Sequence, residues 1–248
     1  MKRILKLLTG IVGIGISVSI IAYFVLNQPL PTGTRGPEAD SLARKMVEAI
    51  GGQRLDSTHY LQWSFANNHH YLWDRRRNLV QVRWSDKRVL LNLDKWSKGV
   101  AYEGIKIVSG DDLDKLRGKA WEYFCNDSFW LIAPTKVFEE GIERFVVPQE
   151  DGSDALLVRY TTGGVTPGDA YLWHLDKQGL PLSYQMWVSI IPVGGVEATW
   201  EDWITLDSGL KVPTSHKIGP LVIPISNVIG SSTLPETGGT EDPFEEIL

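Results

Sequence analysis

The chain has 248 residues, of which 43% are hydrophobic and 22% are charged, and its formal net charge is −5. That length and hydrophobic content suffice for one sizeable core, so the economical interpretation is a single exported domain, and the acidic balance argues against nucleic-acid binding. The single cysteine, Cys125, excludes an internal disulfide framework and a paired-cysteine metal site, and the aromatic residues around it indicate a buried structural thiol.

Residues 1–26 predict a membrane anchor. Residues 7–26 carry no charge, and about 20 helical residues would cross the ~30 Å of hydrocarbon in a bilayer. Lys2, Arg3 and Lys6 precede this run, so the positive-inside rule places the following domain outside the cytoplasm, in the bacterial periplasm. The alternative is a cleaved signal peptide and a secreted protein. The apolar run is long for a signal peptide and lacks a small-residue cleavage site, so we expect a retained single-pass signal anchor in the bacterial cell membrane.

Residues 27–37 are rich in proline and glycine and predict a linker that holds the domain, residues 38–232, away from the membrane. The domain begins with an amphipathic helix over residues 38–52 that ends at two glycines. Period-two alternation then predicts strands over residues 59–65, 69–75, 79–84 and 88–93. A second helix follows over residues 109–132 and ends before Pro134.

Alternation resumes after the second helix and predicts strands over residues 143–148, 155–160, 170–175, 182–190, 196–204, 211–218 and 221–229. The connections are short and meander-like, which indicates an α+β domain built on one large antiparallel sheet. Residues 233–248 form an acidic tail that we expect to be loosely held. Within it, "LPETGG" at 234–239 matches a sortase recognition motif, but a short acidic stretch follows, so we interpret the match as a coincidence.

A sheet of about a dozen strands must twist and curl, which predicts an unclosed β-barrel with the two helices covering its concave face. We expect a partly open apolar cavity there, because such a sheet encloses more volume than two helices fill. The alternative is an ordinary filled core. The residues expected to line the cavity are large and mostly aromatic: Trp63, Phe65, Trp84, Leu91, Phe129, Trp130, Tyr171, Trp173, Tyr184, Met186 and Trp200.

Three stretches carry a resemblance to a known family: "HHYLWDRRRNLVQVRW", "NDSFWLIAPTKVFEEGIE" and "VTPGDAYLWHLDKQGLPLSYQMWV". They resemble uncharacterised exported bacterial proteins of the outer-membrane lipoprotein carrier (LolA/LolB-like) fold, over roughly residues 38 to 230. The chain departs from the expected pattern at Glu139-Glu140-Gly141, where an Asp-Pro-Gly would be expected. The resemblance implies that helices cover the concave face and that the aromatic lining accepts acyl chains. It assigns no individual ligand-contacting residue.

The sequence shows no reaction chemistry. His69 and His70 are adjacent on a predicted strand, so they point to opposite faces and do not share a metal ion with His59 or Asp74. No G-x-S-x-G elbow is present, and the glycines of the N-terminal run do not follow a strand as a nucleotide loop would. Arg75 to Arg77 could meet an acidic headgroup or partner, but the solvated end of a hairpin is the simpler interpretation. We therefore expect no enzyme activity, cofactor or metal.

The leading hypothesis is a membrane-anchored, extracytoplasmic protein that binds a lipid or the acyl part of a lipoprotein in its half-barrel. The alternative is an envelope protein-protein interaction or sensor domain with a filled core and no ligand. A lipid-modifying enzyme is a third hypothesis, and it would require polar side chains that converge inside the cavity.

Overall fold

The computed structural model describes residues 26–162, 166–234 and 242–248. The predicted membrane span, residues 7–26, lies outside these residues except for Leu26. Across the described ranges, no helix is both long enough and apolar enough to cross a bilayer.

Two α-helices are described, α2 (Pro37–Ala49) and α3 (Gly110–Ile132), with 3-10 turns η1 (Gly52–Ser57), η2 (Trp96–Lys98), η3 (Ala133–Lys136) and η4 (Glu245–Ile247). The strands before α3 are β1 (Tyr60–Phe65), β2 (His69–Asp74), β3 (Leu79–Trp84), β4 (Lys87–Asn92), β5 (Val100–Glu103) and β6 (Lys106–Ile107). Those after it are β7 (Ile142–Pro148), β8 (Asp154–Tyr160), β9 (Ala170–Leu175), β10 (Pro181–Trp187), β11 (Val196–Thr199), β12 (Ile204–Thr205), β13 (Lys211–Val212), β14 (Ser215–Ile218) and β15 (Leu221–Ser231).

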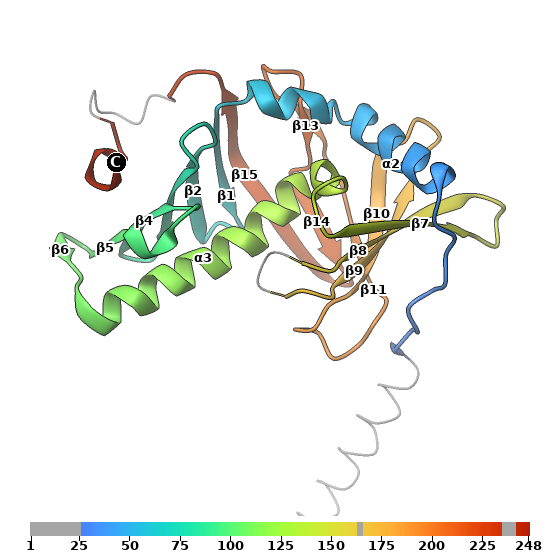
Figure 1. The fold of residues 1–248 in the computed structure, drawn as a ribbon, viewed down its shortest axis with the longest axis horizontal. Coiled ribbons are helices and arrows are strands. Elements are labelled where there is room, and N and C mark those ends of the chain that lie inside the picture. Colours follow the sequence, from blue (N-terminus) through green and yellow to red (C-terminus); the bar gives the residue numbers. More distant parts are fainter. Residues whose placement is uncertain (1–25, 163–165, 235–241) are drawn as a thin grey trace, which may run out of the picture.

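The strands form two large antiparallel sheets where the sequence predicts one. One sheet has the order β14-β15-β1-β2-β3-β4-β5-β6, and the other has the order β11-β10-β9-β8-β7 (Figure 1). The ladder is interrupted between β11 and β14, where an isolated bridge pairs Glu201, two residues after the end of β11, with Ser215 at the start of β14. The described chain is therefore an α+β fold around a large antiparallel sheet that does not close into a barrel.

Local backbone chemistry explains the interruption. The sequence predicts one strand over residues 196–204, but β11 ends at Thr199, and Asp202 takes a positive φ of 54°, a conformation typical of turns and uncommon in strands. Residues 211–218 are likewise divided, because Pro213 lies between β13 and β14 and cannot donate to a ladder. Period-two alternation alone could not reveal these breaks.

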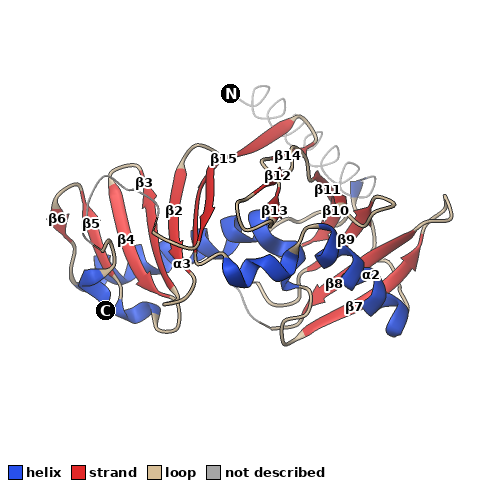
Figure 2. Cartoon of the chain, turned by 90° about the horizontal axis from the view of Figure 1, so that it is seen from above, coloured by secondary structure: helices blue, strands red, loops and turns tan. Residues whose placement is uncertain are grey.

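The inner face of the sheets is covered by the helices. Figure 2 shows α3 running along one side of the eight-stranded sheet toward the five-stranded sheet. Its buried side chains recur at helical spacing: Ala120, Phe124, Asp127, Ser128 and Leu131. Helix α2 packs beside β7 and β8 and buries Ala39, Ala43 and Met46.

The outer faces are covered by the predicted linker and by part of the tail that the sequence predicts to be loosely held. The predicted linker packs on the five-stranded sheet, where Thr34 forms a bridge with Val146, and the Trp187 indole donates 2.8 Å to the carbonyl of Gln28. Residues 242–248 of the predicted loose tail pack on the eight-stranded sheet, where Phe244 is fully buried. Both segments have polar or flexible composition overall, but a few side-chain and backbone contacts are enough to hold them.

Candidate functional site

The eleven residues expected to line a cavity all belong to one hydrophobic cluster on the inner face. Trp84 and Phe129 are partly buried, and the other nine are buried. The cluster draws on both sheets and on α3, so residues distant in sequence meet there. Whether they enclose a ligand cavity stays a prediction.

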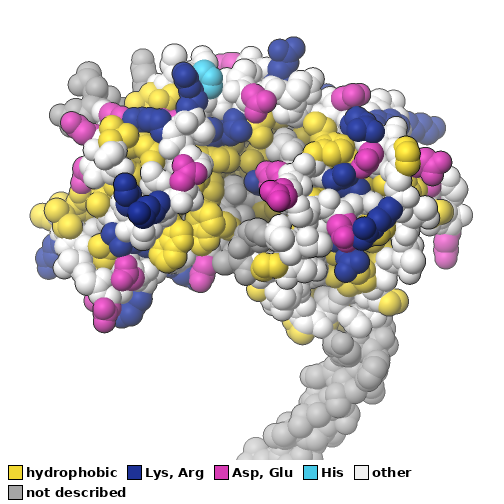
Figure 3. All heavy atoms as spheres, in the orientation of Figure 1, with side chains coloured by type: hydrophobic (Ala, Val, Ile, Leu, Met, Phe, Trp, Pro, Cys, Tyr) yellow, Lys and Arg dark blue, Asp and Glu magenta, His cyan; other side chains and the backbone are white. Residues whose placement is uncertain are grey.

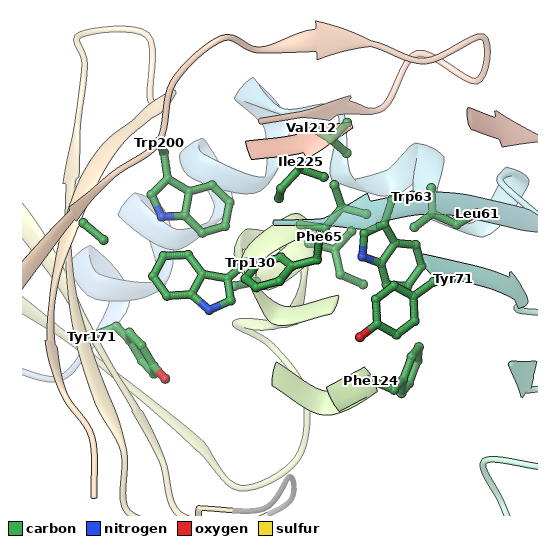
Figure 4. Close-up of a cluster of buried hydrophobic side chains, with 14 of the residues drawn as sticks. Leu61, Trp63, Phe65, Tyr71, Phe124, Trp130, Tyr171, Trp200, Val212 and Ile225 are labelled. Carbon is green, nitrogen blue, oxygen red and sulfur yellow. The ribbon is translucent and has the colours of Figure 1, made fainter. Parts of the chain in front are cut away.

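The rings pack against one another in two groups, one over each sheet (Figure 4). Over the eight-stranded sheet, Trp63 stacks on Tyr71 with ring centroids 4.4 Å apart, and Phe124 of α3 lies 6.3 Å from Trp63. Over the five-stranded sheet, the centroid of Trp173 lies 4.9 Å from that of Trp200. Helix α3 joins the two groups, because its successive residues Phe124, Phe129 and Trp130 reach different sheets.

Several polar groups of the aromatic side chains in this interior have no hydrogen-bond partner in the described part of the protein. Among the described residues, the indole N–H groups of Trp63, Trp73, Trp173 and Trp200 and the hydroxyl of Tyr160 are buried without a hydrogen bond to the protein. Most buried polar atoms in proteins do have partners, so five such groups in one cluster are unusual. Each of the five can donate a hydrogen bond. A carbonyl oxygen placed beside one of them would supply the missing acceptor.

A polar cluster lies where α3 contacts β2. The carboxylate of Asp127, 1% exposed, accepts hydrogen bonds from the Tyr71 hydroxyl and, at 2.8 Å, from the Asn126 side-chain amide. His69 Nδ1 lies 2.7 Å from the same carboxylate, and the Tyr123 ring stacks on the imidazole at 3.9 Å. Burial, followed by the Asp127 charge, raises the pKa of Tyr71 well above its usual range, so the phenol stays a donor.

Sequence reasoning missed Asp127, although a signal was present. Asp127 stands three residues after Phe124 and seven after Ala120, within the apolar stripe of the second helix. A lone carboxylate at a core position requires a buried partner. The partners on β2, however, could be identified only from the fold.

His216 is also buried against the aromatic cluster. Its Nδ1 lies 2.8 Å from the carbonyl of Thr199, and its ring meets Trp200 edge to face at 4.8 Å. Its Nε2 faces the backbone carbonyl of Trp130 without forming a hydrogen bond to it. That carbonyl has no N–H donor four residues later in the helix, because residue 134 is proline. Burial lowers the pKa of His216 to about 4, although the two carbonyls favour the protonated form.

A cleft of about 510 Å³ lies beside the aromatic cluster, and its lining is mostly polar. It is lined by Leu55, Asp56, Trp73, Arg75, Asn78, Asp94, Ile132, Thr135, Lys136 and Glu139. Its charges are largely compensated inside the cleft, since Lys136 pairs with Glu139 at 3.1 Å and Asn78 donates to Asp94 at 2.6 Å. It therefore differs in character from the predicted apolar cavity.

The remaining polar candidates have structural contacts. His69 and His70 point to opposite faces as expected, since His70 Nδ1 bonds with Ser64 Oγ at 2.8 Å. In the described part of the chain, no group of three metal-ligating side chains converges. The prediction that Arg75 to Arg77 are solvated is wrong for two of the three residues. Arg75 donates hydrogen bonds to the carbonyls of Leu55 and Thr58. Arg77 binds the carboxylates of Asp74 and Asp242.

Figure 3 shows the molecule in space-filling form, with hydrophobic side chains gathered on the side where α3 crosses the eight-stranded sheet. Partly buried aromatic residues of the cluster include Trp73, Trp84, Trp121, Tyr123 and Phe129. The cluster is therefore partly open to solvent along the side of α3.

No protein-family model matches the chain, and no curated protein matches it. Among solved structures, a DUF1329 family protein from Desulfovibrio piger is similar at 12% identity and a TM-score of 0.40, covering 80% of this chain and 95% of its own. A domain described as an outer membrane lipoprotein-sorting protein, from Vibrio parahaemolyticus, is similar at 11% identity and a TM-score of 0.33, covering 82% and 97%. Likeness at this level identifies neither a family nor a function.

Proposed function

We propose that the chain is an extracytoplasmic binding protein that takes up a lipid, or the acyl part of a lipoprotein, in the aromatic interior between the sheets and α3. The apolar run at residues 7–26 would hold it at the membrane. The observation that carries the proposal is the set of five buried donors without a protein acceptor inside a largely apolar cluster. An acyl chain with an ester or amide carbonyl combines the two chemistries that this interior offers.

Uptake requires space, and α3 is the element that would provide it. Its aromatic side chains fill the region between the two ring groups, as the contacts of Phe124 with Trp63 and of Trp130 with Tyr184 indicate. A ligand would replace these contacts as α3 moves outward. Burial of apolar surface contributes roughly 25 cal/mol per Å², so one acyl chain could supply several kcal/mol toward binding. We therefore expect weak selectivity among acyl chains of different length.

The test uses the chain from residue 26 onward, because every contact described above is made within that range. The purified protein is extracted with organic solvent, the extract is examined by mass spectrometry, and uptake of a fluorescent fatty acid is titrated. We expect copurified lipid or saturable uptake. Trp130→Ala, which widens the interior next to Tyr184, should change the affinity at least several-fold.

The matched control is Trp96→Ala, because Trp96 is 41% exposed on η2 and lies outside the aromatic cluster. It should leave uptake unchanged. No copurified lipid together with no saturable uptake by a folded protein would refute the proposal. Uptake that both tryptophan variants alter equally would place the fatty acid on the surface instead.

A second candidate is an envelope interaction or sensor domain with a filled core. The direct ring contacts favour it, for example the stacking of Trp63 on Tyr71 at 4.4 Å. This candidate predicts that Trp130→Ala only destabilises the fold, with no lipid bound in either protein. The same titration therefore separates the two candidates.

A further inference from the structure

The outer face of the eight-stranded sheet holds a peptide-sized site that is separate from the aromatic interior. Leu72, Leu79 and Leu90 of neighbouring strands form an apolar floor, and each is at most 3% exposed because Phe244 and Ile247 cover them. We call Leu72, Arg77, Leu79, Arg88, Leu90 and Tyr102 the outer-face site, and residues 242–248 the resident segment. Strand alternation separates this site from the inner face, because Tyr71 and Trp73 flank Leu72 and point the other way.

Charges complement each other at both ends of the resident segment. Arg77 binds the carboxylate of Asp242 through both terminal nitrogens, and Asp74, 1% exposed, accepts from Arg77 Nε at 2.5 Å. Further along, Arg88 lies 3.3 Å from Glu246. The Arg77 guanidinium also lies 5.5 Å from the centre of the Phe244 ring. The site therefore recognises an aspartate, an aromatic ring two residues later and a glutamate two residues after that.

Side chains alone attach the resident segment. Its backbone hydrogen bonds among the described residues are internal, such as Glu245 N to the carbonyl of Asp242 at 3.2 Å, and it adds no strand to the sheet. The ion pair between Arg77 and Asp242 is partly exposed, with each side chain 33% accessible. The two buried apolar side chains and the ion pairs of Arg77 and Arg88 together must thus offset the entropy lost by ordering seven residues, which leaves little net free energy to hold the segment in place. Such an attachment is reversible.

The apolar surface continues beyond the resident segment. Tyr102, whose hydroxyl contacts Glu246, is the cross-strand partner of Ile107 on β6, so both side chains lie on the outer face. Ile107 is 72% exposed, and β6 is the edge of the sheet. A longer segment bound in the same way could cover Ile107, which the resident segment leaves open.

We propose that the outer-face site is a docking site for an acidic segment of a partner protein with an aromatic anchor, spaced Asp-x-Phe-x-Glu followed by an apolar residue, and that residues 242–248 are its resident competitor. A partner segment that also reaches Ile107 makes a contact that the resident segment lacks, and this allows displacement. A second copy of this chain gains no such advantage, because its own residues 242–248 are identical to the resident segment.

The experiment measures fluorescence anisotropy of a labelled peptide, DPFEEIL, capped at both ends. Three proteins are titrated: the full chain, a chain that stops after Leu234, and the full chain with Phe244→Ala. We expect saturable binding to the shortened chain and at least tenfold weaker binding to the full chain, whose site is occupied. The Phe244→Ala chain should bind more tightly than the full chain, which keeps the test valid if the shortened chain does not fold.

Two controls establish specificity. A peptide with alanine at the phenylalanine position should bind at least tenfold more weakly, and Arg77→Gln in the shortened chain should weaken the parent peptide similarly. Absence of binding to a shortened or Phe244→Ala chain that is folded by circular dichroism would overturn the proposal. Equal binding of the phenylalanine and alanine peptides would overturn it too, and so would a concentration-dependent dimer of the full chain held by exchanged segments.

Discussion

Tyr71 on β2 donates a hydrogen bond to Asp127 on α3, and this bond is the centre of a polar cluster in an otherwise apolar contact between the helix and the sheet. His69 reaches the same carboxylate from the same strand. The cluster fixes the position of α3 along the sheet, because a shift of the helix would leave buried polar groups without partners. Four predictions test this arrangement and its surroundings.

Asp127→Asn should lower the free energy of unfolding by roughly 1–3 kcal/mol, because the amide adds donors where Tyr71 and His69 need acceptors. Chemical denaturation followed by tryptophan fluorescence measures the loss. Asp114→Asn on the same helix is the control, since that carboxylate is exposed and pairs only with Arg117 at 3.0 Å. Equal effects of the two substitutions would show that the buried cluster does not hold the helix.

Cys125 should react slowly with thiol reagents at pH 8. Burial raises the pKa of its thiol to about 12, with a small opposing effect of Lys136, so the reactive thiolate is scarce. If Asp127 holds α3 in place, Asp127→Asn should accelerate labelling severalfold by exposing the helix more often. The structure leaves Cys125 partly buried where the sequence predicts a buried thiol, and a labelling rate equal to that of a free cysteine would show that this partial burial does not protect it.

Stability should fall as pH drops from about 6.5 toward 4 because of His216. Burial lowers the pKa of folded His216 to about 4, so in this window the unfolded chain binds a proton that the folded chain does not. This contribution of His216 to the free energy of unfolding is fully present above the pKa that the residue has in the unfolded chain, and it is at most roughly 3 kcal/mol. Urea unfolding at a series of pH values should show a flatter dependence for His216→Gln. Parallel curves for the two proteins would contradict the prediction.

Phe244→Ala should cost less than Leu91→Ala, although both side chains are fully buried. Loss of Leu91 leaves a cavity in the main cluster and should cost about 2–5 kcal/mol. Loss of Phe244 is limited by the docking free energy of residues 242–248, because the segment can detach; we expect less than about 2 kcal/mol. Thermal and urea unfolding of both variants measure the difference. A larger loss for Phe244→Ala would show that the segment belongs to the cooperative core.

The two helices and the longer strands could be predicted from the sequence because they depend on local periodicity, whereas the short strands β5 and β6 were not predicted. The spacing of Leu116, Ala120 and Phe124 indicated α3, and alternation placed Trp63 and Trp173 on inner faces. The same patterns selected the eleven side chains that meet in one cluster. These features depend on residues a few positions apart, so no knowledge of the fold was needed.

Only the tertiary structure could decide which distant groups meet. The partners of Asp127, the interruption between β11 and β14, and the covering of the outer faces by residues 27–36 and 242–248 all join positions far apart in sequence. Composition marks residues 242–248 as acidic and flexible, yet Phe244 finds a site built from three strands. The free energy of such a contact depends on both surfaces, and the local sequence describes only one of them.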